Sequence, residues 1–228
     1  MPRKKIAETK FTAPHERPAV RERSFHLEFL NAAQKQAWVA FQEHDILILD
    51  GPAGTGKTHL AVAFAANEVL AKRKKKIVIT RPIVEAGESL GFLPGTLDEK
   101  VHPYMIPIFD SLTKLVGNQS TAQRELLNHS IEIAPLAYMR GRTFDDAICI
   151  FDEAQNATYA QLKLFLTRFG KNSKVILTGD LNQSDLPGKV ALVEVIDRIK
   201  TIPGVGMVDF QNESIIRHPL IGKLLEKL

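Results

Sequence analysis

The chain has 228 residues, of which 44% are hydrophobic and 25% charged, a composition typical of a globular protein with one large domain or at most two small ones. No apolar run approaches the roughly 20 residues that a membrane-spanning helix needs. The charged start MPRKKIAETK has no apolar segment behind it, so we expect neither a signal peptide nor a membrane partner. The single cysteine, Cys149, excludes an intrachain disulfide and indicates a buried, reduced thiol in a cytoplasmic compartment.

The formal net charge of +4 is concentrated at the N-terminus. Residues 1–23 hold seven Lys or Arg and three Asp or Glu, so the remaining 205 residues are balanced. This segment also contains Pro2, Pro14 and Pro18 and has no sustained periodicity. We therefore expect 1–23 to be a mostly disordered basic tail and 24–228 to form the folded domain. The tail would suit either electrostatic help with nucleic acid or simple solubilisation.

Short apolar runs alternate with helical patterns along the rest of the chain. Strands are predicted at 46–50, 77–80, 131–134, 147–151 and 174–178, with an edge strand at 206–210. Helices are predicted from Asn31 as N-cap to 43, after 58 to about 70, at 98–116 with breaks at Pro103 and Pro107, and at 119–128, 159–169, 190–200 and 219–228. This alternation predicts an α/β fold with a mainly parallel sheet covered by helices on both faces, which binds ligands at the carboxyl ends of its strands.

The stretch 51–58 has the pattern of a phosphate-binding P-loop. It reads GPAGTGKT, fits G-x-x-x-x-G-K-[ST], and lies between a predicted strand and a predicted helix. The residues expected to contact a nucleotide are Gly51, Pro52, Ala53, Gly54, Thr55, Gly56, Lys57 and Thr58. Glycines let backbone N–H groups approach a phosphate, Lys57 is expected to reach the β- and γ-phosphates, and Thr58 to hold Mg²⁺. The alternative is a Gly-rich turn that binds nothing.

An acidic pair ends the strand at 147–151. The sequence ICIFDE at 148–153 fits the Walker B pattern, an apolar strand followed by Asp and Glu. Asp152 is expected to hold Mg²⁺, and Glu153 to polarise the water that attacks the γ-phosphate. The competing interpretation is a solvated acidic pair at a strand end, which the P-loop about 95 residues upstream makes the weaker one.

Six blocks of sequence carry a resemblance to a known family. They are GPAGTGKT at 51–58, TRPIVEAGESLGFLPG at 80–95, APLAYMRGRT at 134–143, FDEAQN at 151–156, TGDLNQSDLP at 178–187 and IIRHP at 215–219. Together they resemble the PhoH family, P-loop ATPases related to the motor domains of superfamily-one helicases. The resemblance implies a RecA-like fold, binding and hydrolysis of ATP with Mg²⁺, and coupling to RNA or single-stranded DNA.

The resemblance also implies roles for two glutamines. In P-loop helicases a strand ending in G-D-x-x-Q supplies a glutamine that contacts the γ-phosphate, and this pattern makes Gln183 a candidate catalytic sensor. The alternative is a local turn capped by Asp180. A glutamine upstream of the P-loop reads the adenine edge in such proteins, which makes Gln34 a candidate, although an exposed helix glutamine is the simpler interpretation.

The related helicases place ATP between two motor domains, and this chain has room for one. A homo-oligomeric ring, by the same resemblance a hexamer, would let a neighbouring copy supply the arginine that stabilises the transition state. The candidates for this arginine are Arg217, which we prefer, Arg140 and Arg142. Structural ion pairs are the alternative for each of them.

Nucleic-acid contacts are predicted after the second strand. Arg81 opens that loop, at a position that touches the nucleic-acid backbone in related motors, and Arg140 and Arg142 are further candidates. Lys72–Lys76 could extend a track for a single strand, although cations also suit the end of a helix. The alternative for Arg81 is pairing with Glu85 or Glu88 to shape the loop.

Three functions are therefore in competition. The first is an ATP hydrolase that moves along or remodels RNA or DNA, including by helicase activity, and the second is an ATP-gated binding or assembly switch without motor activity. The third, a small-molecule kinase, lacks an evident acceptor site. The joint presence of Lys57, Thr58, Asp152, Glu153 and Gln183 favours hydrolysis.

Overall fold

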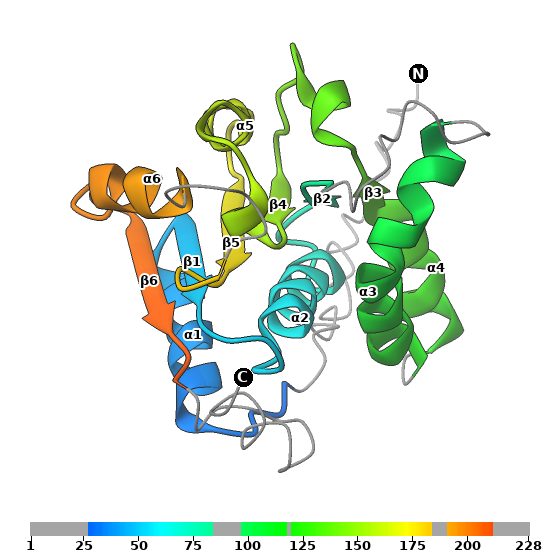
Figure 1. Ribbon diagram of the computed structural model, residues 1–228. Helices are drawn as coiled ribbons and strands as arrows, with labels where there is room; N and C mark the ends of the chain where they lie inside the picture. The colour runs from blue at the N-terminus through cyan, green and yellow to red at the C-terminus, as the bar shows by residue number, and fades with distance from the viewer. Residues whose placement is uncertain (1–26, 84–96, 118–119, 184–190, 212–228) are drawn as a thin grey trace, which may run out of the picture.

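The computed structural model describes residues 27–83, 97–117, 120–183 and 191–211 (Figure 1). Its centre is a six-stranded sheet in the order β3-β2-β4-β5-β1-β6, in which every printed pairing is parallel. The strands are β1 Ile46–Asp50, β2 Lys76–Thr80, β3 Ile131–Ile133, β4 Ala147–Phe151, β5 Lys174–Gly179 and β6 Val205–Asp209. All six predicted strands are confirmed to within two residues, and β6 lies at an edge as expected.

The described residues form six α-helices, of which α1 precedes β1 and the others lie between strands. They are α1 Ala32–Glu43, α2 Lys57–Leu70, α3 Leu97–Gly117, α4 Thr121–Ser130, α5 Tyr159–Leu166 and α6 Ala191–Ile199. Short 3₁₀ turns, η2 Leu136–Met139 and η3 Ala154–Asn156, follow β3 and β4. Among the described residues, no helix is both long and apolar enough to cross a membrane.

The sheet is covered on both faces, which confirms the predicted α/β class. Alternate strand residues divide between two buried clusters, because successive side chains of a strand point to opposite faces. Ile77 and Ile79 pack with α1 to α4, whereas Val78 packs with α5, α6 and η2. Figure 1 shows α2, α3 and α4 on one side of the sheet and α5 and α6 on the other. Cys149 is buried in the second cluster, and burial raises the pKa of its thiol to about 12, in keeping with the unreactive cysteine that the sequence predicts.

The helix starts follow the capping residues in the sequence. Asn31 accepts a hydrogen bond from the Gln34 backbone N–H at 2.9 Å, as predicted for the start of α1. Ser120 and Thr158 begin α4 and α5 with complete capping boxes.

One helix prediction was wrong. The expected breaks at Pro103 and Pro107 do not occur, and α3 runs through both prolines. The two are four residues apart and exposed, so they share one face of the helix, where water can satisfy the carbonyls that lose an N–H partner. The predicted tail at 1–23 and the predicted last helix at 219–228 lie outside the described residues.

The strand order brings the two nucleotide motifs together. β5 lies between β1, which leads into the P-loop, and β4, which ends in the acidic pair. The strands are parallel, so all three reach the same edge of the sheet with their carboxyl ends. We call this the carboxyl edge and the opposite one the amino edge.

Candidate nucleotide site

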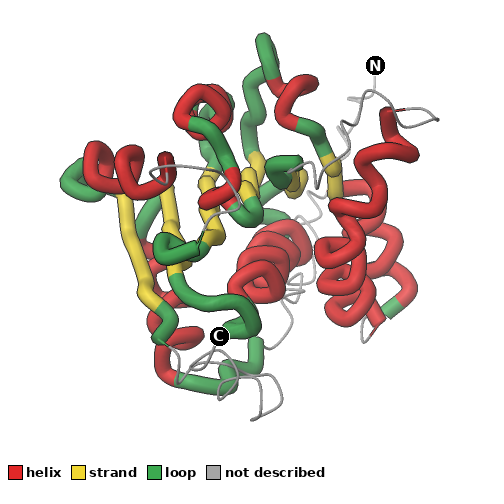
Figure 2. The backbone as a smooth tube through the Cα atoms, viewed as in Figure 1, coloured by secondary structure: helices red, strands yellow, loops and turns green. Residues whose placement is uncertain are grey.

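The P-loop joins β1 directly to α2. Gly54 and Gly56 have φ of +90° and +85°, conformations that cost a residue with a Cβ about 1 kcal/mol or more. Gly56 is the N-cap of α2, so Lys57 and Thr58 occupy its first turn. The Thr55 hydroxyl donates to the Pro52 carbonyl at 3.0 Å and closes the loop from within. Figure 2 shows this loop between β1 and α2 at the carboxyl edge. A helix N-terminus of this kind attracts anions.

A cavity of about 740 Å³ opens over the P-loop. Its lining comes from the N-terminal segment, the P-loop and α2, the ends of β2, β4 and β5, and helix α3. The lining residues are Glu28, Leu30, Gln34, Ala53, Gly54, Gly56, Lys57, Thr58, His59, Leu60, Arg81, Pro107, Ser111, Lys114, Glu153, Thr178 and Gly179. Of the predicted site residues, Gln34, Lys57, Thr58, Arg81 and Glu153 therefore share one cavity with the loop.

The ammonium group of Lys57 lies on the loop itself. Its Nζ donates to the carbonyls of Gly51 and Pro52, the second at 2.9 Å. Burial lowers the pKa of Lys57, although Glu153 and Asp180 oppose the shift. These are weak partners for a partly desolvated cation, which would gain by turning towards phosphate oxygens.

Asp152 is the most buried charge of the site. Its side chain is 1% exposed, and its Oδ1 accepts hydrogen bonds from Thr58 Oγ1 at 2.7 Å and Thr178 Oγ1 at 2.6 Å. Its Oδ2 has no hydrogen-bond partner among the described residues and lies 3.6 Å from Arg81 Nη1. Burial raises the pKa of Asp152 because the hydroxyl donors only partly offset the cost of desolvating a carboxylate.

This geometry fits a hard cation such as Mg²⁺. A buried carboxylate oxygen without a hydrogen-bond donor is an unfavourable arrangement that a cation would relieve. The Thr58 hydroxyl donates a hydrogen bond to Asp152 and keeps its lone pairs for another partner. Asp152 and Thr58, the two residues predicted to hold the metal, are therefore in direct contact.

Glu153 follows Asp152 in a left-handed conformation, with φ of +52°. Its Oε1 lies 3.7 Å from Arg81 Nη2, and its Oε2 accepts a hydrogen bond from Gln155 Nε2 at 2.5 Å. The Gln155 side chain also accepts from the Asp180 N–H at 3.2 Å, which ties Glu153 to the end of β5.

The two glutamines predicted from the resemblance differ in position. Gln34 is 3% exposed, lines the cavity, and accepts a hydrogen bond from the Leu30 N–H at 2.9 Å through Oε1. Gln183 is exposed and is not part of the cavity lining; its own N–H bonds the Asp180 carbonyl at 3.3 Å. The sensor role of Gln183 thus remains a prediction.

The predicted arginines also separate. Arg81 lies between Asp152 and Glu153, at the nucleotide cavity. Arg142 pairs with Glu132 at 2.6 Å and lies over the Phe144 ring, whose other neighbour is Lys76 at the first residue of β2. Arg142 therefore lies towards the amino edge, away from its own P-loop. Arg140, two residues earlier in the sequence, is exposed. Arg217, Glu85 and Glu88 lie outside the described residues.

Three contributors were missed by the sequence analysis. Thr178 binds Asp152 from β5, and its signal was its place as the last hydroxyl before the Gly-Asp at a strand end. Gln155 belongs to the D-E-A-Q block that was read only for its acids. Lys114 of α3 lines the cavity and, together with burial, lowers the pKa of His59. No local pattern signals Lys114, because its position depends on the packing of α3 on α2.

The strand, loop and helix around Lys57, with Asp152 reached across β5, define the class: this is a P-loop NTPase domain. Residues 26–228 match the model of the family described as PhoH-like protein, and the chain belongs to that family. The resemblance seen in the sequence is thereby confirmed.

Individual relatives are similar over most of this chain. A PhoH-like protein of Bacillus subtilis (strain 168) is 50% identical over 195 residues, which cover 85% of this chain and 61% of the relative. A PhoH-like protein of Synechocystis is 45% identical over 196 residues, covering 85% and 59%. The protein PhoH of Escherichia coli (strain K12) is 42% identical over 200 residues, covering 86% and 56%. The chain thus spans less than two thirds of the length of these curated relatives.

Solved structures give a weaker likeness. The helicase domain of Pyrococcus furiosus Hef superposes with a TM-score of 0.43 and 16% identity, covering 77% of this chain and 37% of that one. At that score the likeness carries no argument about this chain.

Proposed function

We propose that this chain is a Mg²⁺-dependent ATPase that couples hydrolysis to binding, unwinding or remodelling of RNA or single-stranded DNA. The observation that carries the proposal is the contact of Thr58 with Asp152 beside Lys57 and Glu153 in one cavity. These are the residue types that phosphoryl transfer to water requires, a cation for the phosphates, ligands for a metal and a carboxylate for the water.

Each residue has a defined task in such a reaction. The P-loop N–H groups and Lys57 would bind the triphosphate, Lys57 leaving the carbonyls of Gly51 and Pro52 as it does so. Thr58 and Asp152 would hold Mg²⁺, which neutralises charge on the β- and γ-phosphates. Glu153 would accept a hydrogen bond from the attacking water and orient it.

Gln34 is placed to contact the base of the nucleotide. The Leu30 N–H fixes Gln34 Oε1, which sets the plane of the amide and leaves Nε2 as a donor. An adenine offers a ring nitrogen that accepts and an amino group that donates, so a fixed amide in this cavity would favour ATP over other nucleotides.

The proposed coupling to nucleic acid and the proposed ring are both argued from arginines. Arg81 is the arginine of the described residues that lines the cavity, and it contacts the chain's own acids. A transition-state arginine from a neighbouring copy would complete the site in a head-to-tail ring, with Arg217, Arg140 or Arg142 as the candidate. A strict monomer with ATP and Mg²⁺ would refute the ring.

Phosphate release from the purified chain tests the proposal. The wild type should hydrolyse ATP only with Mg²⁺, Lys57→Ala should abolish release, and Glu153→Gln should abolish release while keeping ATP binding. Single-stranded RNA or DNA should raise the rate, the more so at low salt. Tight ATP binding without any release by the wild type would favour the ATP-gated switch instead.

A further inference from the structure

The Glu153 carboxylate has a different neighbour at each of its oxygens. Oε1 faces the Arg81 guanidinium at 3.7 Å and Oε2 is bonded to Gln155 at 2.5 Å. A carboxylate that orients an attacking water needs an oxygen that can accept the water's hydrogen bond. In the described site the charge of Glu153 is therefore paired with Arg81 at Oε1, while Gln155 bonds Oε2.

The two restraints on Glu153 differ in strength. Gln155 is 6% exposed and is itself anchored by the Asp180 N–H, so it forms a fixed support for Oε2. Arg81 is 23% exposed and meets its two carboxylates at 3.6 and 3.7 Å, beyond hydrogen-bond length. The contact of Arg81 with Oε1 is therefore the one that is easily exchanged.

Phosphate oxygens are better partners for this guanidinium than the contacts it now makes. They carry a full charge and accept two parallel N–H bonds from an arginine. Arg81 follows the end of β2 and lines the cavity together with Glu153, so a phosphate that enters the cavity can reach the guanidinium.

We propose that Arg81 is a positioning residue that holds Glu153 back until the phosphate backbone of single-stranded nucleic acid draws the guanidinium away. Once Arg81 leaves, Oε1 exchanges its ion pair for the hydrogen bond of a water, while Gln155 keeps Oε2 and the orientation of the side chain. The inference rests on the proposed ATPase function and gives it a regulatory step. The contact of Arg81 with the nucleic-acid backbone would then act directly on Glu153, the carboxylate proposed to orient the water.

Steady-state phosphate release by the full chain tests this link. Arg81→Gln removes the charge, and kcat without nucleic acid should rise about fivefold, the most that a partly exposed ion pair contributes. The KM for ATP should change less than twofold. A single-stranded oligouridylate should raise the wild-type kcat by a similar factor and leave Arg81→Gln unchanged, and Arg81→Lys should lie between the two.

Two controls make the result specific. Arg81→Gln/Glu153→Gln should release no phosphate, which shows that the gain passes through Glu153. Arg198→Gln, which breaks an exposed ion pair with Glu194 on α6, should behave as the wild type. Thermal unfolding of Arg81→Gln reports whether the fold is kept.

The opposing outcomes are equally distinct. If Arg81→Gln folds but has a lower kcat, Arg81 stabilises the transition state. If its KM for ATP is raised, Arg81 binds the nucleotide phosphates. Either result would overturn the proposed restraint of Glu153. Undiminished stimulation of Arg81→Gln, or none of the wild type, overturns the release by nucleic acid. If neither protein releases phosphate, the proposed ATPase itself fails together with this step.

Discussion

Buried charged side chains have different sets of partners at the carboxyl edge and at the amino edge of the sheet. At the amino edge, Lys174 and Lys74 each have several hydrogen-bond acceptors. At the carboxyl edge, one oxygen of Asp152 has no hydrogen-bond donor among the described residues. Because both edges belong to the same set of strands, the difference reflects what each edge is for and not a difference in fold.

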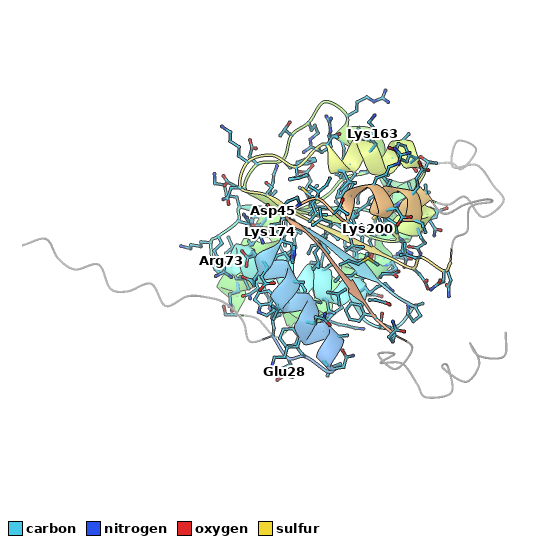
Figure 3. All side chains as sticks on the ribbon, turned by 90° about the vertical axis from the view of Figure 1, so that its left-hand side faces the viewer. Glu28, Asp45, Arg73, Lys163, Lys174 and Lys200 are labelled. Carbon is cyan, nitrogen blue, oxygen red and sulfur yellow. The ribbon has the colours of Figure 1, made fainter. Side chains whose placement is uncertain are left out.

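The amino edge is well satisfied. Lys174 Nζ donates to the carbonyls of Phe41, Gln42 and His44, between 2.7 and 3.1 Å, at the end of α1. Figure 3 shows Lys174 beside Asp45, at the end of α1 remote from Glu28. Lys74, 8% exposed, donates to both the backbone and the side-chain oxygen of Asn172. These contacts close the loops that begin the strands.

The carboxyl edge keeps unfavourable arrangements. Asp152 Oδ2 is buried without a hydrogen-bond partner among the described residues. Burial raises the pKa of Asp50, which lies just before the P-loop with Asp209 and Asp180 near it. A bound cation would relieve a buried carboxylate oxygen of this kind. The comparison therefore predicts that substitutions at the two edges separate stability from activity.

The largest separation should come from two lysines. Lys57→Ala should lower kcat by about 10²–10³ or more, because a cation aimed at the developing charge is lost, and should change the unfolding temperature little. Lys174→Ala should do the reverse. It leaves three helix-end carbonyls without their donor, at a cost of about 2 kcal/mol, or about 4–8 °C in Tm. Equal losses of activity in both variants would remove the distinction between the edges.

Asp152→Asn should stabilise the nucleotide-free protein. The amide keeps an oxygen for Thr58 and Thr178, and a buried charge is removed, which should add about 0.5–2 kcal/mol at pH 7.5. Burial raises the pKa of Asp152 in the folded state, so the folded state binds this proton more tightly than the unfolded chain does. The cost of the charge is absent below the unfolded pKa and grows as pH rises towards the folded pKa.

The gain of Asp152→Asn over the wild type should therefore shrink as pH falls to about 4, and Mg²⁺ with ATP should no longer stabilise the variant. Denaturant unfolding across this pH range measures both effects. The matched control is Asp146→Asn at the amino edge. Hydrogen bonds from Lys75 and Asn172 lower the pKa of Asp146, so neutralising it should destabilise the protein. The same sign for both variants would contradict the comparison.

Gln34→Glu should affect the nucleotide base alone. The carboxylate still accepts from Leu30 N–H but has no donor for a ring nitrogen, so the KM for ATP should rise about tenfold with kcat little changed. Gln36→Glu, on the exposed side of the same helix, is the control. An unchanged KM for ATP in Gln34→Glu would show that Gln34 has a purely structural role.

The smallest effect is expected for Arg142→Ala. Its ion pair with Glu132 is partly exposed, and such pairs contribute about 1 kcal/mol or less. If Arg142 has only this role, the variant should unfold within a few degrees of the wild type and hydrolyse ATP normally. Loss of turnover by a folded oligomer would instead identify Arg142 as the arginine supplied to a neighbouring copy.

Much of the fold could be predicted from the sequence because the local signals were strong. Four of the apolar runs, those of β1, β2, β4 and β5, end in or directly before Gly, Asp or Thr. Asn31 and Thr158 located two helix starts. The prolines of α3 misled because a local rule gives the cost of a proline and not the packing that overcomes it. Met105, Ile108 and Leu112 of this helix are buried in the core that α2 shares.

The site was predictable in its motifs and not in its contacts. Lys57, Thr58, Asp152 and Glu153 were found from spacing, since each lies next to a strand end. Their mutual arrangement depends on the strand order, which places β5 between β1 and β4 and brings Thr178 to Asp152. The nucleic-acid contact of Arg81 was predicted from the family resemblance, and no sequence pattern records that Arg81 meets Glu153.

The central claim, that charges at the carboxyl edge serve a reaction and those at the amino edge serve stability, is tested most directly with two matched carboxylates. Phosphate release, ATP binding and thermal unfolding should be measured for Glu153→Gln and Asp146→Asn beside the wild type. We expect Glu153→Gln to bind ATP and unfold normally but to lose about 10²-fold or more in kcat, and Asp146→Asn to keep full turnover and to unfold at a lower temperature. Normal hydrolysis by Glu153→Gln would contradict the account.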